Sequence, residues 1–208
     1  MSSTPAFDVI NQASGVYPIS PTAFHPDGAV DRSSMDRLTD FYLEIGATGI
    51  TVLGQLGEAP KLSQAESVAI AQAMVRRASG IPVIVGVSAP GFASMRELTH
   101  EVMSIGASGV MIAPPNTLRT DQQIVTYYQQ AADAIGKDVP IVLQDYPLTF
   151  SVQMAPDVIR RMVQEIPSIA MLKHEDWPGL EKISALRQFE ANGSMRHIAI
   201  MCGNGGLF

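Results

Sequence analysis

Lys173 is the residue of this 208-residue chain whose type and position best suit covalent chemistry. It ends the apolar run IAML, whereas Lys61 and Lys137 lie in polar loops and Lys182 lies on a predicted helix with acidic neighbours. Desolvation at the end of a buried strand favours the neutral amine, which is the form that attacks a ketone. The sequence therefore predicts that Lys173 forms a Schiff base with a 2-oxo acid.

Glu175 is the nearest candidate for proton transfer. It stands two residues beyond Lys173, so the two side chains share one face of an extended strand. A carboxylate there can move protons during carbon–carbon or carbon–oxygen cleavage. The alternatives are structural: Lys173 reaches solvent or pairs with Glu175 or Asp176, and Glu175 forms only a salt bridge at the rim.

Two glycine-containing turns are candidates for binding a substrate carboxylate. GQLGE (residues 54–58) and GNGG (residues 203–206) each follow an apolar run, and N–H groups exposed in such turns bind anions. Either segment is equally compatible with a simple turn. The candidate substrate-binding residues in them are Gly54, Gln55, Leu56, Gly57, Gly203 and Asn204. No GxGxxG or GxxxxGK[ST] pattern opens a helix, so no nucleotide cofactor is indicated.

Gln144, Asp145 and Tyr146 end another apolar run. Gln144 and Tyr146 alternate with Asp145, so at most one of these two sets faces a site at the strand end. We take Gln144 and Tyr146 as further catalytic candidates, after Glu175. A Ser–His–Asp mechanism is not indicated, because the chain has no nucleophile-elbow motif.

Seven short apolar runs must position these side chains. They are residues 15–24, 49–54, 82–89, 109–115, 140–147, 169–176 and 197–204. Continuous apolar runs favour parallel strands covered on both faces. The segments between them have helical patterns, with capping boxes at Ser63/Glu66 and Ser94/Glu97 and with Pro178 in the first turn of a helix. The alternation predicts an α/β fold.

The arrangement of the repeated units leaves two architectures open. IGATGITVLG (45–54) and IGASGVMIAP (105–114) repeat the order helix end, glycine turn, buried strand, which suits a barrel or a doubly wound sheet. Similar turns recur in any α/β protein. A closed barrel needs eight strands and typically ~250 residues. Seven predicted strands therefore indicate either an open sheet or a barrel sequence that lacks its C-terminal part.

Composition narrows the classes of partner. The net charge of −6 and the absence of a Lys/Arg cluster argue against nucleic acid. Cys202 is the only cysteine, so no intrachain disulfide forms, and four scattered histidines do not predict a zinc site. The N-terminal MSSTPAFDVINQ does not resemble a signal peptide, and no apolar stretch approaches the ~20 residues that span a bilayer. We expect a cytoplasmic protein with small-molecule partners and no membrane contact.

The motifs in their order resemble the dihydrodipicolinate synthase / N-acetylneuraminate lyase family of class I aldolases. The resemblance runs from about Gly15 to the last residue through seven blocks: PTAFHPDGAVD, GQLGEAPKLSQAE, PVIVGVSA, IGASGVMIAPP, IVLQDYP, MLKHED and IMCGNGG. It implies a (β/α)8 TIM barrel in a single domain over residues 1–208. Seven βα units are visible, and the eighth strand and C-terminal helices are missing. It also implies a Schiff base at Lys173, no metal or cofactor, and a homo-oligomer.

Departures from the family pattern narrow the expected reaction. Gln55 and Leu56 replace the usual Thr-Thr or Ser-Thr, and Gln144 replaces the usual tyrosine. Pro115 and Asn116 replace a Tyr-Tyr pair, and an expected arginine is absent from residues 148–150. Dihydrodipicolinate synthesis and sialic acid cleavage become less expected. Gln144 and Asp145, with Lys173 and Glu175, are more similar to the branch of this family whose members dehydrate or cleave 2-keto-3-deoxy sugar acids.

The expected function is thus a Schiff-base lyase, in which N–H groups of Gln55 and Leu56 hold the substrate carboxylate. The first alternative is a condensation of pyruvate of the dihydrodipicolinate synthase type. The second is a non-catalytic relative or fragment that keeps the fold. A doubly wound nucleotide-binding sheet is the least favoured reading, because the phosphate loop is absent.

Overall fold

The structure is a computed structural model and describes residues 5–78 and 80–205. Within these residues, six parallel strands form one sheet in the order of the chain. They are β1 (Ile50–Val52), β2 (Val83–Gly86), β3 (Gly109–Ile112), β4 (Ile141–Asp145), β5 (Ile169–His174) and β6 (Ala199–Cys202). Because every neighbouring pair is parallel, all six carboxyl ends meet at one edge of the sheet. This is the edge where the candidate residues lie.

The first predicted strand, residues 15–24, is not a strand in the structure. It makes one isolated parallel bridge, between Ile19 and Thr51. Two hydrogen bonds tie it beside β1, from Ser20 N to Thr51 O (2.8 Å) and from Thr51 N to Pro18 O (2.9 Å). Pro18 and Pro21 have no N–H, which prevents a longer ladder. The predicted count of seven strands is therefore wrong for the described residues, although this segment takes the first place beside the sheet. The missing eighth strand stays a prediction.

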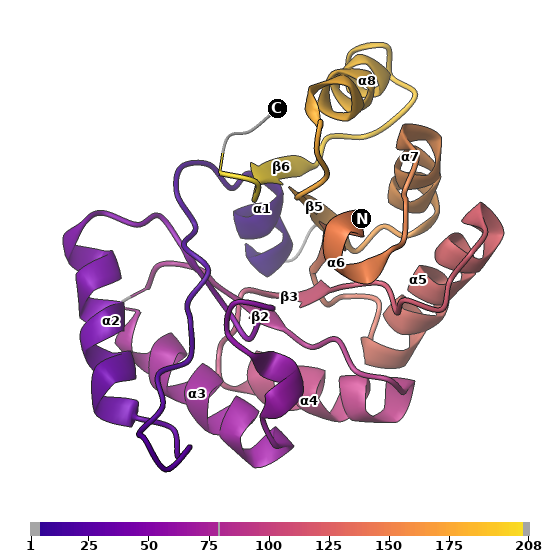
Figure 1. Cartoon of the computed structure of the whole chain (residues 1–208). Coiled ribbons are helices and arrows are strands. Elements are labelled where there is room, and N and C mark those ends of the chain that lie inside the picture. Colours follow the sequence, from indigo (N-terminus) through magenta and orange to yellow (C-terminus); the bar gives the residue numbers. More distant parts are fainter. Residues whose placement is uncertain (1–4, 79, 206–208) are drawn as a thin grey trace.

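Helices of the described residues form an arc around the outer face of the sheet (Figure 1). They are α2 (Arg32–Glu44), α3 (Gln64–Arg77), α4 (Phe92–Ser104), α5 (Asp121–Ile135), α7 (Pro156–Glu165) and α8 (Leu180–Ala191). Between them and the strands lies the larger apolar core, with residues such as Val85, Leu143 and Leu172. The curved α/β arrangement fits the predicted fold class, with strands that are covered by helices.

A second, smaller core fills the inner face of the sheet. Alternate strand residues, including Met111 and Met171, pack there against Ile10 of the short helix α1 (Pro5–Asn11). Two further short elements follow strands: the 3-10 helix η1 (Ala59–Lys61) after β1, and α6 (Pro147–Phe150) after β4. Side chains on the strands thus alternate between an inner and an outer core.

One of the two predicted capping boxes is confirmed. Ser63 accepts from the backbone of Glu66, and the Glu66 carboxylate accepts from the backbone of Ser63, at the start of α3. The box at Ser94 and Glu97 is wrong, because α4 begins earlier, at Phe92. The ring of Phe92 lies 5.6 Å from that of Tyr127, and this packing holds the helix start ahead of Ser94.

The predicted position of Pro178 is also wrong. It precedes α8, and Gly179 is the residue that caps the helix. The Gly179 carbonyl lies 3.2 Å from His174 Nε2, so contact with the strand end fixes where this helix begins.

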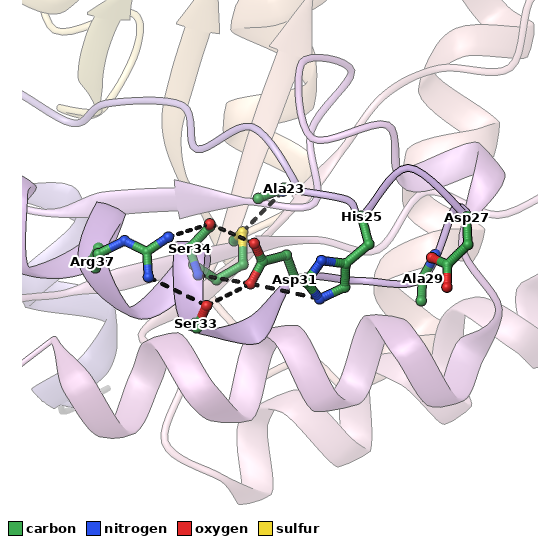
Figure 2. A network of polar contacts seen from close by, with 9 residues as sticks. Ala23, His25, Asp27, Ala29, Asp31, Ser33, Ser34 and Arg37 are labelled. Carbon is green, nitrogen blue, oxygen red and sulfur yellow. Dashed lines mark hydrogen bonds and ion pairs between the residues drawn. The ribbon is translucent and has the colours of Figure 1, made fainter.

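The start of α2 is held by a polar network, which Figure 2 shows. The Asp31 carboxylate accepts hydrogen bonds from the backbone of Ser34 (3.0 Å) and from the hydroxyls of Ser34 (2.6 Å) and Ser33 (2.7 Å). These bonds hold the pKa of Asp31 well below its usual range. Arg37 donates in turn to the Ser34 hydroxyl. The network is a helix cap with charged and hydroxyl partners.

Candidate active site

Lys173 lies on the inner face of β5, next to its end, and is 3% exposed. Its amino group lies 3.0 Å from Glu175 Oε1, and the Glu175 side chain is 9% exposed. The alternatives of a solvent-exposed lysine and of a pair with Asp176 are thereby excluded, and the pair with Glu175 is present. Such a buried pair holds both side chains in one place and leaves the amine beside a group that can take its proton.

Gln144 completes this cluster from the neighbouring strand. It stands opposite Lys173 in the β4–β5 register, and its Nε2 donates to Glu175 Oε2 at 2.8 Å. The hydrogen bonding between the strands continues past the end of β5, from Glu175 N to O of Asp145, the last residue of β4 (2.8 Å). The structure therefore brings three of the four predicted catalytic side chains together, with Glu175 between Lys173 and Gln144.

Tyr146 lies apart from the ion pair. It is half-buried at the start of α6, and the edge of its ring packs against Phe150, 6.3 Å between centroids. Its hydroxyl makes no hydrogen bond with any described residue. Tyr146 lines a cavity that Glu175 also lines, so it is close to the cluster without being part of it.

Two cavities meet at the Lys173–Glu175 pair. The first, about 500 Å³, lies on the inner side of the sheet and is lined by Lys173, Ile19 and Gly203 among others. Burial raises the pKa of the Tyr17 hydroxyl, which also lines this cavity.

The second cavity, about 390 Å³, lies on the other side of the ion pair. Its lining residues are Tyr146, Leu148, Glu175, Trp177, Gly203 and Asn204. Gly203 belongs to both cavities, and Glu175 is paired with the lysine of the first. A molecule bonded to Lys173 would therefore have space on both sides.

The GQLGE turn follows β1 at the same edge of the sheet. Leu53, which precedes the turn, and Glu58, which ends it, are in the left-handed region, with φ values of 57° and 56°. Among the described residues, nothing accepts a hydrogen bond from the N–H groups of Gln55, Leu56 or Gly57. These donors remain available to an anion.

This turn adjoins the first cavity. A Cβ on Gly54 would lie 3.4 Å from Ile19, which lines that cavity together with Lys173. The predicted binding residues Gly203 and Asn204 follow β6 and line the second cavity. The last residue of the GNGG motif, Gly206, lies outside the described residues.

A second polar cluster, which the sequence did not reveal, lies on the outer face of the same strand ends. Asp145 Oδ2 lies 3.0 Å from His174 Nδ1 and 2.8 Å from the amino group of Lys182 on α8. Lys182 also pairs with Asp176, at 2.7 Å. Because Asp145 and His174 alternate with Gln144 and Lys173, this cluster is separated from the ion pair by the thickness of the sheet. The available signal was this alternation, together with the acidic neighbours of Lys182.

The described residues contain no group of three or more His, Cys, Asp or Glu side chains that could hold a metal ion. Within the same part of the chain, no helix has both the length and the apolar character that a membrane crossing needs.

Comparison with known proteins places this geometry among relatives. A sequence model of the dihydrodipicolinate synthetase family matches residues 12–191. A crystal structure of dihydrodipicolinate synthase from Rhodopseudomonas palustris is 62% identical with a TM-score of 0.93, over 95% of this chain and 66% of that one.

Curated relatives carry two kinds of activity in their names. The 4-hydroxy-tetrahydrodipicolinate synthase of Laribacter hongkongensis is 35% identical over 71% of this chain and 50% of its own length. The probable 2-dehydro-3-deoxy-D-pentonate aldolase YjhH of Escherichia coli is 27% identical over 77% of this chain and 53% of its own length. The chain thus spans about half the length of the curated relatives it matches.

Proposed function

The chain belongs to the dihydrodipicolinate synthetase family, and on this premise we propose that the whole protein is a lyase that forms a Schiff base between Lys173 and a 2-oxo acid. The observation that carries the proposal is the buried amino group of Lys173, 3.0 Å from Glu175. The pair lies at the carboxyl ends of the strands, where barrel enzymes carry their active sites.

The first step is the transfer of a proton from the Lys173 ammonium to the Glu175 carboxylate. The neutral amine then attacks the 2-oxo carbon, and Glu175 returns the proton to the hydroxyl that leaves as water. The resulting imine withdraws electrons from C3 and C4 in the way that an organic cofactor would. Gln144 holds Glu175 in place through its 2.8 Å hydrogen bond, so the carboxylate stays within reach of the reacting nitrogen.

The substrate carboxylate binds to the GQLGE turn. The N–H groups of Gln55 and Leu56, together with that of Gly57, supply donors that no described residue uses. The turn adjoins Ile19 in the wall of the first cavity. We therefore place the carboxylate on the side of β1 and the rest of the substrate on the side of β5 and β6.

Two reactions of the imine remain candidates. In the first, a 2-keto-3-deoxy sugar acid or similar compound loses its C4 hydroxyl, or its C3–C4 bond breaks to release pyruvate. The presence of an amide, Gln144, where a tyrosine hydroxyl is usual supports this reading, as does the similarity to the pentonate aldolase. The second is a condensation of pyruvate with an aldehyde, which the name of the 62% identical relative supports.

Reductive trapping tests the proposal. Sodium borohydride is added to the protein with pyruvate, and peptides are analysed by mass spectrometry. The expected result is the mass of a reduced pyruvyl group on Lys173 and on no other lysine. Lys61→Met, at an exposed position, is the matched control and keeps the modification. A folded protein whose Lys173 stays unmodified would overturn the proposal.

We also propose that the protein is a cytoplasmic homo-oligomer that acts on small molecules. Light scattering at several protein concentrations tests the assembly. A single species of monomer mass at every concentration would contradict it.

A further inference from the structure

The second cavity has an apolar rim that the proposed chemistry does not use. Leu148 and Trp177 line it and are 72% and 57% exposed, although both have large apolar side chains. The half-buried ring of Tyr146 forms a third wall. Large apolar groups so exposed at the entrance of a cavity mark a surface that binds something apolar.

The position of the cavity identifies what binds. Its floor includes Glu175, the carboxylate that pairs with Lys173 at 3.0 Å. Gly203 separates it from the cavity of Lys173 and lines both. A substrate held by its carboxylate on the side of β1 must extend past Glu175, and the space that it enters there is this one.

We propose, building on the Schiff base above and replacing the sugar chain of its first candidate substrate by an apolar one, that Tyr146, Leu148 and Trp177 select 2-oxo acids whose chain beyond C4 ends in an apolar or aromatic group. The volume of about 390 Å³ accommodates a phenyl ring or a branched aliphatic group. Aromatic and aliphatic walls bind such a group by removing apolar surface from water. The hydroxyl groups of a sugar chain would instead lose hydrogen bonds to water against Leu148 and Trp177.

The reaction follows from the imine on Lys173. The substrate is a 4-hydroxy-2-oxo acid with an apolar substituent on C4. Glu175 accepts the proton of the C4 hydroxyl, the C3–C4 bond breaks, and its electron pair moves onto the imine to give an enamine. An apolar aldehyde leaves. The enamine is protonated at C3 by Glu175, and water then hydrolyses the imine to pyruvate and free lysine.

The other occupant to consider is a second copy of the chain. A protein interface would not require a carboxyl group at the floor of the pocket, whereas cleavage beside a hydroxylated substrate carbon does. The test therefore includes the oligomeric state as an outcome.

Trp177 provides a direct signal, because it is the only tryptophan of the chain. The probe is 4-phenyl-2-oxobutanoate, which forms the imine but has no C4 hydroxyl and is not cleaved. We expect it to change the Trp177 emission, whereas pyruvate leaves the emission unchanged, and we expect borohydride to trap both on Lys173. If both compounds are trapped without a change in emission, the proposed role of the apolar pocket is wrong, whereas the proposed Schiff-base function is still supported. Trapping of neither would overturn the proposed function instead.

Variants test selectivity. Leu148→Ala and Trp177→Ala should lower kcat/KM for cleavage of 4-hydroxy-2-oxo-4-phenylbutanoate by about tenfold or more, and leave that for 2-keto-3-deoxygluconate within about twofold. Leu180→Ala is the matched control, since Leu180 is 56% exposed nearby but does not line the cavity. Equal losses for both substrates would overturn the proposal. So would a wild-type preference for the sugar acid, or a change of oligomeric state without a change of selectivity.

Discussion

Gly203 and Glu175 are in direct contact: a Cβ built on Gly203 would lie 2.5 Å from Glu175 Cγ and 3.2 Å from its Oε1. The end of β6 therefore determines where the carboxylate on β5 lies. Glu175 in turn contacts Lys173 and Gln144, so the backbone position just after β6 controls the geometry of the ion pair.

Gly203→Ala should consequently displace Glu175 and slow imine formation by about tenfold while the protein stays folded. The displacement separates the carboxylate from the amine that it must deprotonate. The measurement is the rate of borohydride trapping with pyruvate, alongside circular dichroism. Gly91→Ala is the matched control, since a Cβ there meets nothing within 4 Å. Unchanged trapping in Gly203→Ala would show that the position of Glu175 does not matter.

The Lys173–Glu175 pair should show strong energetic coupling. Lys173→Met leaves the Glu175 carboxylate buried without its cation, which costs on the order of 3 kcal/mol of unfolding free energy. Adding Glu175→Gln removes the orphaned charge, so the double variant should recover most of that loss. Urea unfolding of the four proteins gives the coupling free energy, expected at about 1–3 kcal/mol. Additive effects of the two substitutions would contradict a direct pair.

The second polar cluster, Asp145, His174 and Lys182, should contribute to the stability of the fold and not to the formation of the imine on Lys173. Asp145→Asn weakens the contacts to His174 Nδ1 and the Lys182 ammonium, both at 3.0 Å or less, and should destabilise the fold by on the order of 2 kcal/mol. Trapping at Lys173 should persist below the new unfolding midpoint. Asp133→Asn breaks the exposed pair with Lys137 and should leave stability unchanged. Loss of trapping in folded Asp145→Asn protein would contradict this prediction, because it would show that the cluster on the outer face of the sheet affects the reaction of Lys173 on the inner face.

The sequence predicts those relationships that depend on strand periodicity. The shared face of Lys173 and Glu175 follows from their spacing of two, and the structure has them 3.0 Å apart. The contact of Gln144 with Glu175 depends on the register between β4 and β5, which apolar runs do not encode. Tyr146 follows the same alternation as Gln144, but the chain turns into α6 there, and the tyrosine leaves the strand face.

The fold class was predictable and several boundaries were not. Continuous apolar runs predicted all six parallel strands of the described residues, whereas residues 15–24 form only isolated bridges because their prolines lack the donors for a ladder. The start of α4 was missed because packing of Phe92 against Tyr127 outweighs the local capping pattern at Ser94. Contacts between elements, and not the local sequence pattern alone, therefore determine where these elements begin and end.

Tyr127 should make stability fall in alkali. Burial raises its pKa to about 12, above the value near 10 expected in the unfolded chain. Between these values the folded state keeps a proton that the unfolded state has lost, so the unfolding free energy decreases as the pH rises, by roughly 2–3 kcal/mol in total. Tyr127→Phe removes this dependence. Its unfolding free energy relative to wild type should be constant below pH ~10 and increase from there to pH ~12. A difference that stays constant over the whole pH range would show that Tyr127 does not cause the loss of stability.

Gln144→Glu should introduce a pH dependence at the centre of the site. The new carboxylate replaces an amide nitrogen that lies 2.8 Å from Glu175 Oε2, and two carboxylates so close cannot both ionise. The folded pair therefore keeps a proton to a higher pH than either group does in the unfolded chain. The unfolding free energy of the variant is therefore highest relative to wild type below pH ~4. It decreases as the pH rises towards the raised pKa of the pair, by about 1.4 kcal/mol per pH unit. Urea unfolding from pH 4 to pH 8 should thus show Gln144→Glu falling progressively below wild type. Gln144→Leu, which adds no charge, should differ from wild type by a constant amount, and a constant difference for Gln144→Glu as well would mean that the two carboxylates do not meet.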